Sequence, residues 1–169
     1  MRFTSYQKRL FGYALALCRD RELASEIVQD CVVRAMTASR VPCDEPAYRA
    51  WLFTIVRNLW RDHLRKKPSR ADIETSDTGD LGMAPFAHEE TVINVIAVRQ
   101  ALEQLPIQHR DILALVDIAG FGYAEAAAIL GIPEGTAMSR ISRARSALAA
   151  RLRDAVVVQL PTTYRQGMK

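Results

Sequence analysis

The 169-residue sequence has little of what marks disulfide-rich, loop-rich or membrane proteins. Only three cysteines are present, and Cys18, Cys31 and Cys43 lack the C-x-x-C spacing of a zinc site or redox pair. Glycine (8 residues), proline (7) and aromatics (7%) are sparse, which disfavours a loop-rich all-β protein. No apolar run approaches the roughly 18–20 residues of a membrane span. We therefore expect free thiols, a reducing cytoplasmic location and no membrane insertion.

The sequence also lacks the residue groupings that catalysis requires. The three histidines, His63, His88 and His109, are scattered along the chain, and no nucleophile is placed beside a base. No spacing suits a metal ion, and no glycine-rich loop is available to hold a phosphate. We therefore expect neither enzymatic activity nor a bound cofactor.

What the sequence does have is positive charge in two blocks. Residues 1–67 carry 13 basic and 7 acidic side chains, and residues 92–169 carry 9 and 6. Between them, residues 68–91 carry 1 basic and 6 acidic side chains. Two basic blocks on either side of an acidic strip favour a polyanionic partner such as nucleic acid.

Apolar residues recur at spacings of three and four, which predicts helices. Leu23, Ile27, Cys31 and Ala35 share one face, behind a capping Asp20. Periodicity disappears in the polar, Gly- and Pro-containing residues 68–91, which we interpret as a flexible acidic linker. The fold class is all-α, with two small helical domains. The predicted divisions are residues 1–67, the linker at 68–91, residues 92–155 and a C-terminal tail at 156–169.

The C-terminal half has the spacing of a helix-turn-helix. A helix predicted over 107–119 ends at Gly120 and Gly122, and a short helix over 123–130 follows. The turn at 131–133 contains Gly and Pro, and a long helix is predicted from residue 134 to about 154.

The polarity of the long helix makes this pattern more specific. Its apolar residues share one sector of the helix: Ala137, Ile141, Ala144, Leu148 and Leu152. Thr136, Ser139, Arg140 and Arg143 point elsewhere, with side chains that suit base edges in a DNA major groove. Arg145, Arg151 and Arg153 suit phosphates, which position a protein on DNA without specifying sequence.

A second candidate site combines aromatic and basic residues near the end of the N-terminal half. Such a combination is typical of proteins that stack unpaired bases and follow the backbone with cations. Helical spacing favours a core role for Trp51, whereas Asn58 and Trp60 suit either role. The candidate set is Arg57, Asn58, Trp60, Arg61, Arg65 and Lys66.

Together these segments resemble the extracytoplasmic-function (ECF) sigma factors of bacterial RNA polymerase. The likeness to conserved region 4 lies in Leu105, Pro106, Arg110, residues 120–125, residues 129–133, Gly135, Thr136 and residues 139–145. The likeness to region 2 lies in residues 28–30, Arg34, Ala35, residues 49–58 and residues 62–65. Two motifs appear in the family's order and flank an acidic linker.

The resemblance implies a factor that binds core polymerase and directs promoter-specific initiation. Glu26, Gln29 and Asp30 would dock on the β′ clamp helices, and the second domain would meet the β flap. Residues 58–61 would lie in a loop that receives a flipped base of the melted minus-ten element. Ser139, Arg140, Ser142 and Arg143 would face the minus-thirty-five duplex. The family also implies an anti-sigma factor and a regulon that responds to stress or envelope signals.

Two other binding functions remain open from the residues alone. A free-standing helix-turn-helix repressor would use the C-terminal half but leaves the N-terminal motifs unexplained. A helical adaptor that binds only protein predicts no salt-sensitive affinity for DNA, whereas each phosphate contact steepens the salt dependence.

Overall fold

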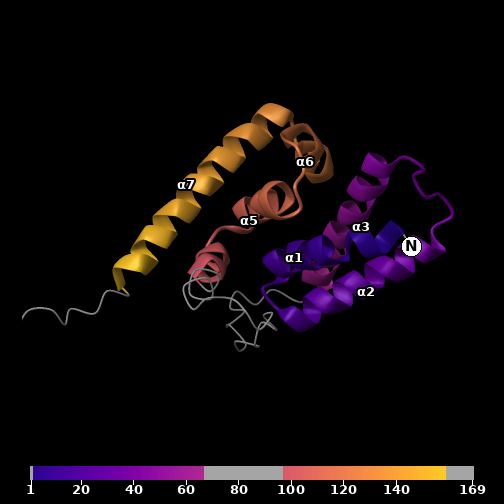
Figure 1. The fold of residues 1–169 in the computed structure, drawn as a ribbon, viewed down its shortest axis with the longest axis horizontal. Helices are drawn as coiled ribbons and strands as arrows, with labels where there is room; N and C mark the ends of the chain where they lie inside the picture. The colour runs from indigo at the N-terminus through magenta and orange to yellow at the C-terminus, as the bar shows by residue number, and fades with distance from the viewer. Residues whose placement is uncertain (1, 67–96, 159–169) are drawn as a thin grey trace, which may run out of the picture.

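The computed structural model describes residues 2–66 and 97–158, with side chains described up to residue 153 (Figure 1). Within these ranges every regular element is a helix, which confirms the all-α expectation. The predicted linker and the tail beyond residue 158 lie outside the described residues. In chain order the elements are η1 (Arg2–Ser5), α1 (Gln7–Cys18), α2 (Arg21–Thr37), α3 (Glu45–Lys66), a helical segment at 97–103, α5 (Ile107–Leu113), η2 (Ala114–Ile118), α6 (Tyr123–Leu130) and α7 (Glu134–Val158).

The N-terminal unit, residues 2–66, is a three-helix bundle of α1, α2 and α3. Arg19 ends α1 in the left-handed conformation, at φ 61°. The Asp20 carboxylate then accepts hydrogen bonds from the N–H groups of Glu22 (2.9 Å) and Leu23 (3.1 Å), so the predicted cap is confirmed. Such a cap stabilises a helix by about 1 kcal/mol. The fully buried side chains of the bundle include Leu10, Tyr13, Cys31, Leu52, Phe53 and Val56.

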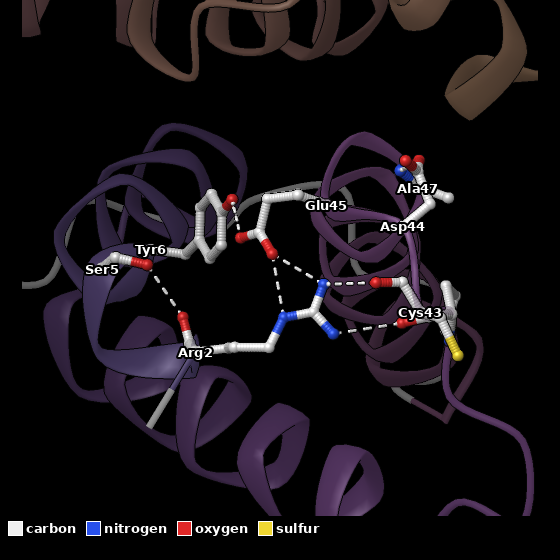
Figure 2. Close-up of polar contacts among 8 residues, drawn as sticks. Arg2, Ser5, Tyr6, Cys43, Asp44, Glu45 and Ala47 are labelled. Atoms are coloured by element: carbon white, nitrogen blue, oxygen red, sulfur yellow. Dashed lines mark hydrogen bonds and ion pairs between the residues drawn. The ribbon is translucent and has the colours of Figure 1, made fainter.

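A polar cluster joins the start of the chain to the start of α3 (Figure 2). Arg2 donates from Nε to Glu45 Oε2 at 2.8 Å, and its guanidinium lies 4.2 Å from the centre of the Tyr48 ring. The Tyr6 hydroxyl donates to Glu45 Oε1 at 2.5 Å. These two hydrogen bonds lower the pKa of Glu45, and the same carboxylate raises the pKa of Tyr6. The cluster therefore holds η1 against α3 most firmly when Glu45 is ionised and Tyr6 is protonated.

The C-terminal unit, residues 97–153, contains the helix-turn-helix formed by α6 and α7. Gly131 caps α6 in the left-handed conformation at φ 68°, which favours glycine. At the other end of α6, the Glu125 carboxylate accepts from the Gly122 N–H at 2.8 Å. On α7, Ala137, Ile141 and Ala144 are buried, which confirms the predicted core face.

The single helix predicted over 107–119 is wrong in one respect. An α-helix ends at Leu113, and η2 continues as a π-helical turn in which the Ala119 N–H donates to the Ala114 carbonyl at 2.8 Å. The Phe121 N–H then donates to the Leu115 carbonyl at 3.0 Å, so the chain turns sharply before α6. Periodicity cannot reveal one wide turn inside an otherwise helical pattern.

The two units pack together, with α5 lying between α7 and α1 (Figure 1). Their buried side chains form one continuous apolar core. Phe53 of α3 meets Phe121 edge to face, with ring centres 4.9 Å apart. Because each unit is small, burial between them adds substantially to what each buries alone.

Candidate nucleic-acid interface

The outward face of α7 carries most of the residues predicted to read duplex DNA. Ser139, Ser142 and Arg143 are exposed, opposite the buried seam, and Thr136 and Arg140 are half-buried beside them. The Ser139 hydroxyl donates to the Thr136 carbonyl at 3.0 Å, and Arg143 Nε donates to the Ser139 carbonyl at 3.2 Å. These bonds hold the polar side chains along a rigid helix, which limits the entropy lost on binding.

Arg145 lies apart from this set, because it is paired within the C-terminal unit. Its Nη2 donates to Asp117 Oδ1 at 2.6 Å and its Nε to Asp117 Oδ2 at 3.3 Å. Its Nη1 also donates to the Tyr123 hydroxyl at 3.3 Å, and these bonds raise the pKa of the guanidinium. Arg145 therefore ties α7 to η2 and α6. To contact a DNA phosphate, its guanidinium would have to bind the phosphate and Asp117 at the same time.

The residues predicted to bind melted DNA divide into two groups on α3. Asn58, Arg61, Arg65 and Lys66 are exposed along its C-terminal turns, and Arg65 pairs with Asp62. The expected loop at 58–61 is wrong, because α3 runs without interruption from Glu45 to Lys66. Helical hydrogen bonds and the buried neighbours Leu59 and Trp60 keep these residues in the bundle.

Trp60 and Arg57 do not join the exposed group. Trp60 is only 7% exposed and packs in the core, so its ring is not presented for stacking. The Arg57 side chain is 16% exposed, and its Nε donates to Asp111 of α5 at 2.9 Å. Spacing on one helix gave no sign of this pairing, because Asp111 belongs to the other unit.

The residues predicted to bind core polymerase lie together on the exposed side of α2. Glu26, Gln29 and Asp30 are all exposed there. Val33 and Met36, one turn and two turns further on, are 59% and 73% exposed. The sequence analysis missed these two residues, although an apolar residue on the polar side of an amphipathic helix is a usable signal of a contact surface.

A cavity of about 150 Å³ lies between α2 and α3 beside this surface. Its lining includes the side chains of Glu26, Asp30, Arg34, Asp62 and Lys66, so both signs of charge are present. No group of acidic, histidine and cysteine side chains in the described ranges is arranged to hold a metal ion. Among the same residues, no helix has the length and apolarity to cross a bilayer.

Both units match known protein families. Residues 2–70 match the sigma-70 region 2 family, and residues 96–148 match the sigma-70 region 4 family. The chain is 36% identical over 146 residues to the ECF RNA polymerase sigma factor EcfG of Rhodopseudomonas palustris, covering 85% of this chain and 78% of that protein. It is 31% identical over 148 residues to the ECF RNA polymerase sigma factor SigM of Mycobacterium tuberculosis, covering 87% and 73%.

Two solved structures have a similar arrangement of helices. The sigma factor RpoE of Bartonella quintana, in complex with the anti-sigma factor NepR, superposes with a TM-score of 0.63 at 26% identity, covering 89% of this chain and 94% of that one. CnrH, in complex with the cytosolic domain of CnrY, superposes with a TM-score of 0.60 at 26% identity, covering 90% and 84%.

The all-helical fold and the family matches over residues 2–70 and 96–148 define a two-region sigma factor of the sigma-70 class. Within that class, the chain belongs to the ECF RNA polymerase sigma factors. It therefore directs promoter-specific initiation by RNA polymerase.

Proposed function

We propose that the two units divide the work of promoter recognition. Residues 1–67 bind core polymerase and the minus-ten element, and residues 92–155 read the minus-thirty-five element as duplex. The observation that carries this assignment is the polarity of α7, whose buried Ala137, Ile141 and Ala144 stand opposite exposed Ser139 and Arg143. A helix held in this way can enter a major groove while its apolar side stays in the core.

The upstream contacts follow from the chemistry of the α7 side chains. Arg143 and Arg140 can bind guanine through paired hydrogen bonds, and Ser139 and Ser142 can contact bases or phosphates. Thr136 lies in the first turn of α7, where its hydroxyl can donate to a phosphate of the DNA backbone. Arg145 contacts a phosphate while remaining close to Asp117, so it positions the helix rather than reads sequence.

The downstream contacts belong to the exposed end of α3. Arg61, Arg65 and Lys66 follow the backbone of the melted strand, and Asn58 reads the edge of an extruded base. Arg57 and Trp60 join them only after the surrounding side chains rearrange, since both are enclosed in the free chain.

The exposed side of α2 suits a protein partner with basic and apolar groups. Glu26 and Asp30 supply negative charge, and Val33 and Met36 supply apolar area that a partner can bury. We assign this surface to the β′ clamp helices of core polymerase and the C-terminal unit to the β flap. The factor works in the cytoplasm, with the polymerase, and needs no cofactor or catalytic residue of its own.

Control by an anti-sigma factor is the proposed form of regulation. One structural neighbour, RpoE, is bound to the anti-sigma factor NepR, and the other, CnrH, is bound to the cytosolic domain of CnrY. Both folds match most of this chain. We therefore assign to this protein an anti-sigma partner and a regulon that answers a stress or envelope signal.

Run-off transcription on a library of upstream sequences tests the proposed function. Core polymerase is assayed with and without the protein, and promoter-selective transcripts should appear only when it is present. If the isolated protein binds specific duplexes but never supports initiation by a cognate core, the repressor alternative replaces this proposal.

A further inference from the structure

A buried carboxylate links three helices across the boundary between the units. Asp111 of α5 accepts from the Tyr13 hydroxyl of α1 at 2.7 Å and from Arg57 Nε of α3 at 2.9 Å. The Asp111 side chain is 8% exposed and that of Arg57 is 16% exposed. Removing one member of such a pair leaves a charge without its partner in a poorly solvated place.

A second contact lies beside it and involves Arg49 of α3. Its Nη2 donates to the Ala119 carbonyl at 2.6 Å, and its guanidinium lies 3.9 Å from the centre of the Phe121 ring. Ala119 directly follows the π-helical turn of η2, whose irregular path brings this carbonyl to α3. Arg49 and Arg57 of α3 are therefore both held by the C-terminal unit.

The Ile118 side chain of η2 packs against α1 where α1 has a glycine. A Cβ atom built on Gly12 would lie 3.1 Å from Cγ2 of Ile118, which is tighter than ordinary contact. Glycine in the middle of a helix is intrinsically unfavourable, so its presence here is explained by the packing. A long side chain at this position would press on Ile118 and oppose the packing of η2 on α1.

We propose that Asp111, Tyr13 and Arg57 form an autoinhibitory latch that holds the two units together in the free protein. The latch rests on the proposed function in one respect, the assignment of Arg57 to the melted strand. A DNA phosphate carries the same sign of charge as the Asp111 carboxylate and can replace it as the partner of Arg57. The replacement requires the C-terminal unit to leave α3, so the closed chain is not competent to capture the minus-ten element.

Two substitutions open the latch by different physical routes while leaving Arg57 in place. Asp111→Asn keeps the side-chain size but removes the charge that compensates Arg57. Gly12→Gln adds a helix-favouring side chain that meets Ile118 and changes none of the polar contacts. Circular dichroism first establishes that each variant is folded. If Asp111→Asn does not fold, Gly12→Gln alone tests the latch. Asp20→Asn is the control, because it removes one negative charge equally and asparagine caps helices as well as aspartate.

Opening is measured by energy transfer between a dye on exposed Cys43 and a dye on Ser146→Cys in α7. Both opening variants should show lower transfer than wild type, and Asp20→Asn should match wild type. In run-off assays at limiting protein, the opened variants should give more transcript, up to about tenfold if roughly one wild-type chain in ten is open.

Three results would overturn the proposal, and each has a distinct meaning. Unchanged transfer in both variants shows that these contacts do not hold the units together. Opening without an increase in transcript shows that the closed state is not inhibitory. If saturating wild type gives no promoter-selective transcript, the proposed function itself fails, and the inhibitory role fails with it.

Discussion

The Phe53 ring of α3 meets the Phe121 ring edge to face, with centres 4.9 Å apart and planes at 85°. Phe53 also packs against Tyr13 of α1, at 5.4 Å between ring centres. One side chain thus belongs both to the core of the N-terminal bundle and to its contact with the C-terminal unit. Aromatic pairs in this geometry add about 0.5–1.5 kcal/mol each to what burial contributes.

Phe53→Ala should therefore lower the free energy of unfolding by about 3–5 kcal/mol. The substitution leaves a cavity shared by both units, so their relative packing weakens as well. Urea denaturation followed by circular dichroism measures the change. Met36→Ala is the control, because Met36 is 73% exposed and its loss should change stability by no more than about 0.5 kcal/mol. Equal effects of the two substitutions would contradict the central position of Phe53.

Arg143→Ala should reduce discrimination among upstream elements by about 1–3 kcal/mol. The exposed guanidinium lies on the outward face of α7, where it can meet a base edge. Competition binding of the holoenzyme to promoters with altered upstream elements measures the change. Arg153→Ala provides the contrast, since loss of a phosphate contact weakens all sequences alike. If Arg143→Ala keeps the wild-type preference among upstream elements, Arg143 does not contribute to sequence recognition.

Asn58→Ala should weaken open-complex formation while binding to core polymerase stays the same. Asn58 is exposed on α3, and alanine removes the amide that reads a base while keeping the helix. Permanganate reactivity of unpaired thymines at the promoter measures opening, and co-elution with core measures binding. A permanganate pattern equal to that of wild type would contradict the assignment.

Asp30→Arg should impair association with core polymerase without unfolding the protein. The substitution reverses the charge at the centre of the exposed surface of α2, next to apolar Val33. Affinity for core, measured by fluorescence anisotropy of labelled protein, should fall strongly. Arg21→Glu, nine residues before Asp30 and on the opposite side of the same helix, reverses a charge outside that surface and should bind normally. Normal binding by Asp30→Arg would refute the clamp role.

The three thiols should differ widely in reactivity near neutral pH. Burial raises the pKa of Cys18 and of Cys31 to about 12, whereas Cys43 is exposed. Because the thiolate is the reactive form, iodoacetamide should modify Cys43 first, as followed by mass spectrometry of peptides. The rate of modification of Cys18 and Cys31 should increase about tenfold for each unit by which the pH is raised, as long as the protein stays folded. Rapid modification of Cys31 in the folded chain would contradict its burial.

Local patterns were sufficient to predict most helices and the exposed face of α7. The Asp20 cap, the Gly131 turn and the seam of Ala137, Ile141 and Ala144 each depend on residues a few positions apart. Glu26, Gln29 and Asp30 were expected from the resemblance to sigma factors, and they lie within two turns on the exposed side of α2. Helical spacing did not predict the π-helical turn of η2. The loop at 58–61, which was expected from the resemblance, is wrong because α3 continues through it.

The sequence by itself determined which segments are helical and which of their faces are polar, because caps and periodicity act over one or two turns. Only the tertiary structure decided what those faces meet. Arg57 and Asp111 are 54 residues apart, and Tyr13 and Asp111 are 98 residues apart, on helices of different units. A basic side chain looks alike in sequence whether it faces DNA or a buried carboxylate. Its partner is set by how apolar surfaces bring distant helices together, which no local pattern encodes.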